Sequence, residues 1–281
     1  MDSTTSNQSI DQETADKFAS SWNNVYDPSV YTKEQFLDWI APWDQDNLAE
    51  KSVLELGCGS GALLFHMKDM GVESLIGLDL GSSVETATKL LGDKAQVEVA
   101  DITKRAELEE RFGQRDRVYS IGVLHHLTVP EDGVDSLIAL TKPGGSFHGW
   151  VYAHEGNWVI RSVVDPIRKV VNHFPWWLTK FLVALPLALP FFMYSKFCTL
   201  LNSVSGTILP LPMFSYMIWI GKRGFSFHHH VAFDQLVTPM THYINKERVE
   251  KWLEDPRVLP ESRYVIFRNG NGWKFGGKIK T

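Results

Sequence analysis

The amino-acid sequence predicts an α/β fold with a seven-stranded, mostly parallel sheet, helices on both faces and an apolar insertion after the fifth strand. Two observations support this fold class. From residue 52 to 152, short apolar runs that end in Gly or Asp alternate with helical patterns, and two further runs close the chain at 263–267 and 273–279. Strands that alternate with helices of about ten residues are typical of a parallel sheet. The alternation breaks after Tyr152, where a long apolar segment begins.

The expected elements follow in chain order. The first five strands are expected at 52–56, 74–78, 96–99, 117–121 and 146–152, and the helices between them at 62–70, 83–91, 104–112 and 131–141. A turn at Pro143-Gly144-Gly145 precedes the fifth strand. A late helix over 245–254 begins at the cap residue Asn245, and Asn269-Gly270-Asn271-Gly272 is a hairpin turn between the closing strands.

Length and charge restrict the class of protein. The chain of 281 residues suits one large domain that carries an insertion. Its net charge of −5, without a long Lys/Arg run, argues against a nucleic-acid partner. The two cysteines, Cys58 and Cys198, lie far apart and outside any CxxC pair, which indicates a reducing, cytoplasmic compartment.

The N-terminal region divides into two parts. Residues 1–14 are polar, have no apolar core of a signal peptide and are expected to form a disordered tail. Phe18, Trp22 and Tyr26 follow at helical spacing, so they share one helix face, and a short helix is expected over 33–40. This aromatic face either packs on the sheet or covers a ligand.

A glycine-rich loop with three carboxylates predicts the cofactor site. The first strand leads into Glu55-Leu56-Gly57-Cys58-Gly59-Ser60-Gly61, where glycines allow a tight turn and a close approach of backbone to ligand. Asp79 ends the second strand, where it can accept hydrogen bonds from ribose hydroxyls. Asp101 and Ile102 end the third, where they can meet an adenine ring. The loop lacks the third glycine of GxGxxG, which suits a sulfonium nucleoside without a diphosphate.

These motifs resemble class I S-adenosylmethionine-dependent methyltransferases, whose fold is Rossmann-like, and the resemblance covers residues 16–153 and, weakly, 234–279. The sequence Ser-Ile-Gly-Val-Leu-His-His-Leu at 120–127 is similar to the subgroup that methylates quinones and other small metabolites. The resemblance implies S-adenosyl-L-methionine as cofactor. Its expected ligands are Trp22, Tyr26, Glu55, Gly57, Cys58, Gly59, Asp79, Leu80, Asp101, Ile102, Ile121 and Val123.

Histidines near the ends of the fourth and fifth strands are candidates for proton transfer. His126 follows the fourth strand, at the edge of the sheet where ligands bind in this architecture, and a neutral imidazole can accept a proton from an acceptor group. Packing or capping is the alternative role. His154 and His242 are the substitute candidates. On the substrate side, the sequence offers His125, Tyr152, Asp234 and Tyr243.

A second histidine cluster, His228-His229-His230, could in principle bind a metal. On a strand, His228 and His230 would point to the same side and could join Asp234 or His242. No helical HxxxH spacing supports such a site. We expect no metal, and a polar loop that shapes the substrate pocket.

The apolar insertion comprises residues 156–230 and separates two parts of the cofactor domain, 15–155 and 231–281. The charge-free run from Lys180 to Lys196 is short and contains Pro186 and Pro190, which argues against a membrane-spanning helix. The insertion is therefore a lid, a peripheral membrane surface over 174–220, a homodimer interface, or a set of additional core helices. A lid is the first expectation, because the insertion follows the fifth strand directly.

The resulting hypothesis is methyl transfer from S-adenosylmethionine to a small, lipophilic or aromatic acceptor, with oxygen favoured over nitrogen or carbon. One alternative is transfer of another group onto a quinone-like ring by the same fold. The other is a non-catalytic, cofactor-binding assembly factor. Fold alone does not assign the acceptor.

Overall fold

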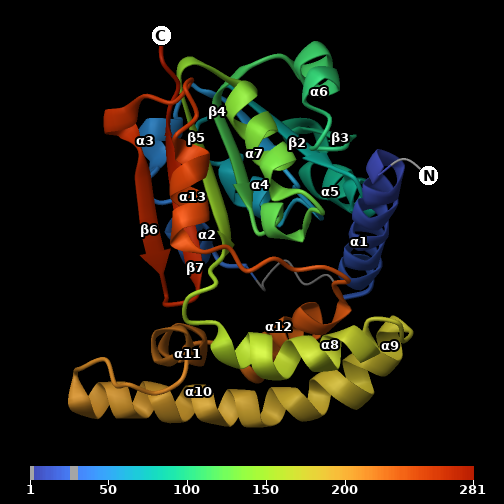
Figure 1. The fold of residues 1–281 in the computed structure, drawn as a ribbon, viewed down its shortest axis with the longest axis vertical. Helices are drawn as coiled ribbons and strands as arrows, with labels where there is room; N and C mark the ends of the chain where they lie inside the picture. The colour runs from blue at the N-terminus through green and yellow to red at the C-terminus, as the bar shows by residue number, and fades with distance from the viewer. Residues whose placement is uncertain (1–2, 26–30) are drawn as a thin grey trace. The chain divides into compact units, whose positions relative to one another are not determined.

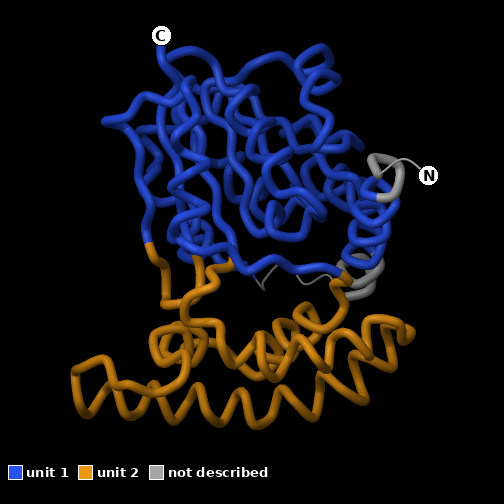
Figure 2. The backbone as a smooth tube through the Cα atoms, in the orientation of Figure 1, with its two compact units in different colours: residues 1–151, 240–266, 273–281 blue, residues 152–239, 267–272 orange. Residues whose placement is uncertain are grey.

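The computed structural model describes residues 3–25 and 31–281, without the side chains of residues 3–6 and 20–25. The chain forms two compact units (Figure 2). Unit 1 comprises residues 1–151, 240–266 and 273–281, and unit 2 comprises 152–239 and 267–272. The sequence-based limits were residues 155 and 231. The second limit lies later in the structure, because the last helix of unit 2 continues to Val237.

One sheet of seven strands organises unit 1 (Figure 1). Its order is β3-β2-β1-β4-β5-β7-β6, and the β1–β2, β1–β4, β2–β3 and β4–β5 pairs are parallel. The strands are β1 Ser52–Leu56, β2 Ser74–Asp79, β3 Gln96–Val99, β4 Arg115–Ile121, β5 Thr141–Tyr152, β6 Tyr264–Arg268 and β7 Gly272–Lys278. The predicted fold class is confirmed, and the chain reverses its direction of winding between β1 and β4.

Helices cover the sheet because its central strands are apolar on both faces. Every residue of β1 is buried, as expected of a parallel strand between two helical layers. The helices of this unit that follow the first are α2 Lys33–Ile40, α3 Gln45–Leu48, α4 Ala62–Met67, α5 Ser83–Leu91, α6 Arg105–Phe112, α7 Pro130–Ala139 and α13 Lys246–Leu253. Asn245 caps α13 as predicted, since its Oδ1 accepts from the Arg248 amide at 3.1 Å.

The fifth strand begins earlier than the sequence predicts. Pro143-Gly144-Gly145 lies inside β5 and is not a turn that precedes it. Arg115 pairs with Thr141 and Arg117 with Ser146, so the strand bulges against β4 between these pairs. Gly144 has φ +75°, which favours glycine at this position.

Helix α1, Ser3–Val25, corrects the expectation of a disordered tail over residues 1–14. Tertiary contacts explain the error. The carboxylate of Asp11 is 8% exposed, and its Oδ1 accepts from the Thr128 amide at 2.7 Å and from the Thr128 hydroxyl at 2.8 Å. Thr14 is also buried. A polar segment with low helix propensity is thus ordered by contacts that only the folded sheet provides.

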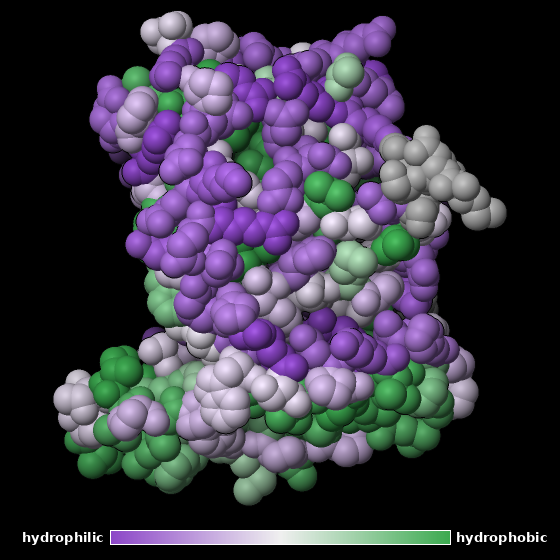
Figure 3. Space-filling view, in the orientation of Figure 1, coloured by the Kyte–Doolittle hydropathy of each residue, from purple (hydrophilic) through white to green (hydrophobic). Residues whose placement is uncertain are grey.

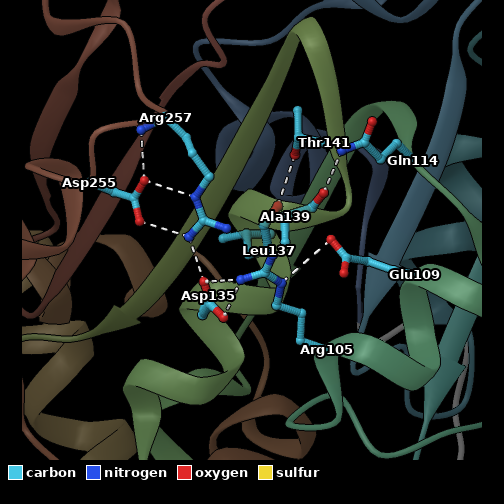
Figure 4. Close-up of polar contacts among 9 residues, drawn as sticks. All are labelled: Arg105, Glu109, Gln114, Asp135, Leu137, Ala139, Thr141, Asp255 and Arg257. Carbon is cyan, nitrogen blue, oxygen red and sulfur yellow. Dashed lines mark hydrogen bonds and ion pairs between the residues drawn. The ribbon is translucent and has the colours of Figure 1, made fainter.

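An ion-pair network fixes the loop before β6 to two helices of unit 1 (Figure 4). The Arg257 guanidinium donates to both Asp255 and Asp135, and Arg105 of α6 reaches Asp135 of α7 at 3.3 Å. These hydrogen bonds raise the pKa of Arg257 and lower that of Asp255. The side chains are partly exposed, so each pair contributes only about 1 kcal/mol or less to stability.

Unit 2 is helical. It contains the π-helix η4 Ile160–Val164, α8 Asp165–Val171, α9 Trp176–Leu178, the π-helix η5 Thr179–Ala184, α10 Leu185–Ser205, α11 Phe214–Gly221 and α12 Phe225–Val237. His228, His229 and His230 lie in α12, so the prediction of a polar loop is wrong. Apolar residues flank these histidines on both sides, and α12 packs against α10.

The prolines do not interrupt the long helix of unit 2. Residues Trp176–Ser205 form one continuous helix that is long and apolar enough to cross a membrane, with 22% of its most apolar window buried. Pro186 lies in the first turn of α10, directly after η5, and Pro190 lies inside α10. A π-turn shifts the backbone hydrogen bonds and so accommodates a residue without an amide hydrogen. The argument that this segment is too short and broken is therefore wrong, although length and composition alone do not establish a membrane span.

Candidate active site

The glycine loop lies after β1 and is held to the end of β2. The amides of Gly57 and Cys58 donate to the Leu78 carbonyl at 2.7 and 2.9 Å. Gly57 has φ +80°, and a Cβ at this position would lie 2.4 Å from the side chain of Val123, which follows β4. Two carboxyl-end loops therefore meet at Gly57, and no other residue fits there without displacing one of them.

Asp79 fixes the same loop through its side chain. Its Oδ2 accepts from the Gly59 amide at 2.8 Å, and its Oδ1 accepts from the Gly81 amide at 2.9 Å and the Ser83 hydroxyl at 3.4 Å. Burial raises the pKa of Asp79, while these hydrogen bonds oppose the rise. The structure thus places Asp79 at the loop as the sequence predicts, and shows a loop-ordering role that its place in the sequence did not reveal.

Glu55 is a buried carboxylate beside the loop. It is 1% exposed and accepts a hydrogen bond from the Tyr119 hydroxyl at 2.8 Å. Burial raises the pKa of Glu55 to about 8, the Tyr119 hydrogen bond lowers it, and the nearby charge of Asp79 raises it. A carboxyl group in this state would become ionised beside a bound cation, such as the ammonium group of an amino acid.

The end of β3 provides the third predicted carboxylate. Oδ1 of Asp101 accepts from the amide and the hydroxyl of Thr103, at 2.9 and 2.7 Å. In the described part of the chain, Oδ2 of Asp101 makes no hydrogen bond. Ile102 is buried, Leu80 after β2 is half-buried, and Cys58 in the glycine loop is buried. These residues follow adjacent strands, as expected of a nucleoside site.

The loop after β4 contains both histidines of the sequence at 120–127, His125 and His126. Ile121 ends the strand, and Leu124–His126 forms a short 3₁₀ helix, η3, whose His125 is fully buried. The rings of His125 and His126 lie 4.2 Å apart. Nδ1 of His126 lies 2.8 Å from the Met240 carbonyl, so the neutral tautomer that donates there keeps Nε2 as the proton acceptor.

His242 lies at the same loop. Its amide donates to the His125 carbonyl at 2.7 Å, and burial lowers the pKa of its side chain. Thr241 places its hydroxyl 3.2 Å from Nδ1 of His126, and Tyr243 beside it is half-buried. The structure therefore brings together two of the three predicted catalytic histidines, and the segment 240–243 positions His126.

Helix α1 crosses this edge of the sheet. Phe18 contacts His126, with ring centroids 4.9 Å apart. A Cβ at Gly81 would lie 2.9 Å from the Ala15 carbonyl and 3.2 Å from the Ala19 Cβ, so the helix backbone passes close to the residue after Asp79 and Leu80. The side chain of Trp22, and Tyr26 altogether, lie outside the described residues.

Three predicted residues belong to unit 2. The Tyr152 hydroxyl accepts from Gln235 at 2.7 Å, Asp234 lies in α12, and His154 is exposed. Among the described residues, no three His, Cys, Asp or Glu side chains are grouped to hold a metal. His228 is instead bound within the unit, with Nε2 2.7 Å from the Ser195 hydroxyl and Nδ1 2.8 Å from the Gly224 carbonyl.

Several contributors to the site were missed from the sequence. Tyr119 donates a hydrogen bond to Glu55, Asp11 and Thr128 anchor α1, and Met240 orients His126. Tyr119 did not stand out from its strand, because β4 also contains Arg115, Asp116, Arg117 and Ser120. The others depend on contacts between residues more than a hundred positions apart, which no local pattern reveals.

Unit 2 has a pocket of its own. Its volume is about 330 Å³, and it is lined by Gly156, Trp158, the segment 208–215 and Gly270. The segment reads Ile-Leu-Pro-Leu-Pro-Met-Phe-Ser, so the lining is mostly apolar. Such a pocket suits an aliphatic or aromatic group.

Comparison with known proteins indicates the same class of protein as the glycine loop and its three carboxylates. Residues 54–147 match a family model described as a methyltransferase domain. The ubiquinone biosynthesis O-methyltransferase of Pseudomonas fluorescens (strain SBW25) is 33% identical over 111 residues, which are 39% of this chain and 47% of that protein. The enzyme of the same name from Bordetella avium (strain 197N) is 30% identical over 154 residues, 52% of this chain and 61% of the relative. The chain thus spans about half to three-fifths of the length of these relatives.

Among solved structures, an O-methyltransferase family protein from Burkholderia thailandensis has a TM-score of 0.50 at 11% identity, over 89% of this chain and 57% of the other. This likeness shows the fold. The family match, the strand order and the glycine loop together identify residues 54–147 as a class I S-adenosylmethionine-dependent methyltransferase domain. The sequence resemblance is confirmed, and S-adenosylmethionine is the cofactor of this class.

Proposed function

We propose that this protein transfers the methyl group of S-adenosylmethionine to a small, lipophilic acceptor. The observation that carries the proposal is the convergence of Glu55, Asp79 and Asp101 on three neighbouring strand ends around the glycine loop. Glu55 would hold the ammonium group of the cofactor, Asp79 the ribose hydroxyls and Asp101 the adenine amino group. Gly57 and Gly59 let the backbone approach, while Ile102, Ile121 and Val123 pack against the nucleoside.

In the proposed reaction, a lone pair of the acceptor attacks the sulfonium methyl carbon as the bond from carbon to sulfur breaks. The sulfur keeps the bonding electrons, and the products are S-adenosylhomocysteine and a methylated acceptor. His126 accepts the proton of the attacking hydroxyl, with Met240 and Thr241 holding the imidazole in orientation. His242 is the second candidate for this role. Because the cofactor is already activated, alignment of the acceptor supplies much of the rate.

One observation supports the acceptor class. The relatives named above are O-methyltransferases of ubiquinone biosynthesis by name, which favours an oxygen acceptor on an aromatic or quinone-like ring. Transfer of a different group would not produce S-adenosylhomocysteine, and an assembly factor would produce neither product, so product analysis separates these functions.

Asp79→Ala tests the cofactor site. We expect titration calorimetry to show binding of S-adenosylmethionine and S-adenosylhomocysteine to the wild type, and a loss of about a hundredfold or more in affinity for the variant. The loss follows from two charge-assisted hydrogen bonds to the ribose, together with the lost ordering of the Gly59 amide. Asp93→Ala, an exposed carboxylate in η2 (Gly92–Lys94), is the control and should bind like the wild type. Absence of binding to folded wild type would favour a non-catalytic module.

His126→Ala tests the proton acceptor. The turnover number should fall by about a hundredfold or more, while the affinity for S-adenosylmethionine stays close to that of the wild type. His173→Ala, an exposed histidine of unit 2, is the control. Unchanged turnover of His126→Ala would remove this role and move the assignment to His242.

A further inference from the structure

Helix α10 and the turn before it expose a stripe of apolar side chains. The stripe consists of Leu182, Leu185, Leu189, Met193, Leu200 and Val204, whose exposed fractions range from 38 to 81%. Their spacing of three, four or seven residues places them on one helix face. Contiguous exposed apolar surface of this length is uncommon on a soluble monomer and marks a contact site.

The opposite face of the same helix is packed inside unit 2. Ala184, Ala188, Ser195 and Cys198 are buried, and α10 contacts α11 and α12. The hydroxyl of Ser195 lies 2.7 Å from Nε2 of His228, so this face also has a satisfied polar contact. A helix with one face occupied by its own unit cannot be surrounded by lipid, which favours a position in the plane of a surface over a span across it.

The single charge in α10, Lys196, lies at the spacing of the stripe, three residues after Met193 and four before Leu200. Its Nζ donates to the carbonyl of Gly221, the last residue of α11, at 2.6 Å and to the Arg223 carbonyl at 3.1 Å. The ammonium group is thus partnered by backbone carbonyls, which lowers the cost of bringing the stripe into an apolar phase.

Charge identifies the partner. Residues 156–230 contain seven Lys and Arg but one acidic residue, Asp165, whereas the rest of the chain contains 21 Lys and Arg and 32 Asp and Glu. Arg161, Lys169 and Lys222 are exposed within this basic segment. Bilayers that contain anionic lipids attract such a segment by about 1 kcal/mol per basic residue near the surface.

Aromatic residues extend the apolar surface beyond the stripe. Trp158, Phe174 and Trp177 are exposed, and Lys180 lies 5.8 Å from the ring of Trp176. Figure 3 shows apolar side chains gathered over the elements of unit 2. Trp and Lys together are typical of the boundary between headgroups and acyl chains.

We infer that unit 2 docks on a bilayer containing anionic lipids, with α10 in the membrane plane, the stripe among the acyl chains and the basic residues at the headgroups. This inference concerns binding and goes beyond the proposed function. It can fail or hold whatever the activity of unit 1, because its test measures the partition of protein onto vesicles.

The test is sedimentation of the full chain with vesicles of phosphatidylcholine, alone or mixed with phosphatidylglycerol. We expect binding to the mixed vesicles, weaker binding to phosphatidylcholine alone, and release of the electrostatic part by salt. Met193→Gln/Leu200→Gln, seven residues apart on the stripe, should weaken binding by about a hundredfold, since each inserted side chain contributes about a tenfold factor. Both side chains are mostly exposed, so thermal unfolding in solution should not change.

Leu37→Gln/Ile266→Gln is the matched control, because both residues are exposed apolar side chains of unit 1. It should bind vesicles like the wild type. No sedimentation with either vesicle would overturn the inference. So would a wild-type dimer that the stripe variant converts to monomer with unchanged lipid binding, which would make the stripe a subunit interface. Wild-type protein that resists alkaline extraction from vesicles would indicate a spanning helix and would also overturn it.

Discussion

Gly57→Ala should lower the free energy of unfolding by about 2–4 kcal/mol and abolish measurable binding of S-adenosylmethionine. Two effects add. An alanine at φ +80° costs about 1 kcal/mol, and its Cβ would lie 2.4 Å from the Val123 side chain, an overlap that costs about 1–3 kcal/mol. Relief of the overlap moves the loop after β1 or the one after β4, and both line the cofactor site. Chemical denaturation and calorimetry measure the two results.

Gly206→Ala separates the two effects. Gly206 is in the left-handed region, with φ +65°, but a Cβ there meets nothing within 4 Å, so only the backbone cost of about 1 kcal/mol is expected. Adding Val123→Ala to Gly57→Ala should restore part of the stability. Equal losses for Gly57→Ala and Gly206→Ala would show that the Val123 contact is not what requires glycine.

Binding of S-adenosylmethionine should release about one proton near neutral pH. The pKa of Glu55 is raised to about 8 by burial, so this carboxyl group is protonated at pH 7 before the ligand arrives. An ammonium group beside it favours the carboxylate and returns the pKa below neutrality. Calorimetry in buffers that differ in ionisation enthalpy measures the number of protons released on binding. Glu55→Gln should release none, and proton release that persists in this variant would assign it to another group.

The same carboxyl group makes stability depend on pH. Its pKa rises from 4.5 in the unfolded chain to about 8 in the folded protein, so the folded state holds a proton that the unfolded chain gives up between these values. The favourable contribution is complete below about pH 4.5 and is lost as pH rises through about 8, with an amplitude of a few kcal/mol. Glu55→Gln should flatten this part of the stability profile.

Local patterns were sufficient for the first three strands and the loops that follow them. Strand β1 ends where Gly57 begins the turn, β2 ends at Asp79, and β3 coincides with the predicted 96–99. Apolar runs of this length have few alternatives when glycine or aspartate ends them. The three carboxylates at the strand ends were predictable for the same reason, since parallel strands bring their carboxyl ends to one edge.

Long-range contacts explain what could not be predicted. No local pattern in residues 3–14 indicates a helix. The helix depends instead on contacts such as the hydrogen bond that the Thr128 amide donates to Asp11, which joins residues 117 positions apart. The helix continues into Pro186 directly after a π-helical segment that propensities do not describe, and Pro190 lies inside α10. His228 looked like a possible metal ligand, yet its ring is satisfied by Ser195 and Gly224, a pairing that depends on how α10 packs on α12.

We expect helix α1 to limit how fast the proposed cofactor site exchanges its ligand. The helix touches Gly81 after β2 and His126 and Thr128 after β4, and β1, which leads into the glycine loop, lies between these two strands in the sheet. A ligand bound at the glycine loop and covered by α1 would dissociate only when α1 undocks. Its residence time would then depend on the contacts of Asp11 and Phe18 as well as on those of the ligand.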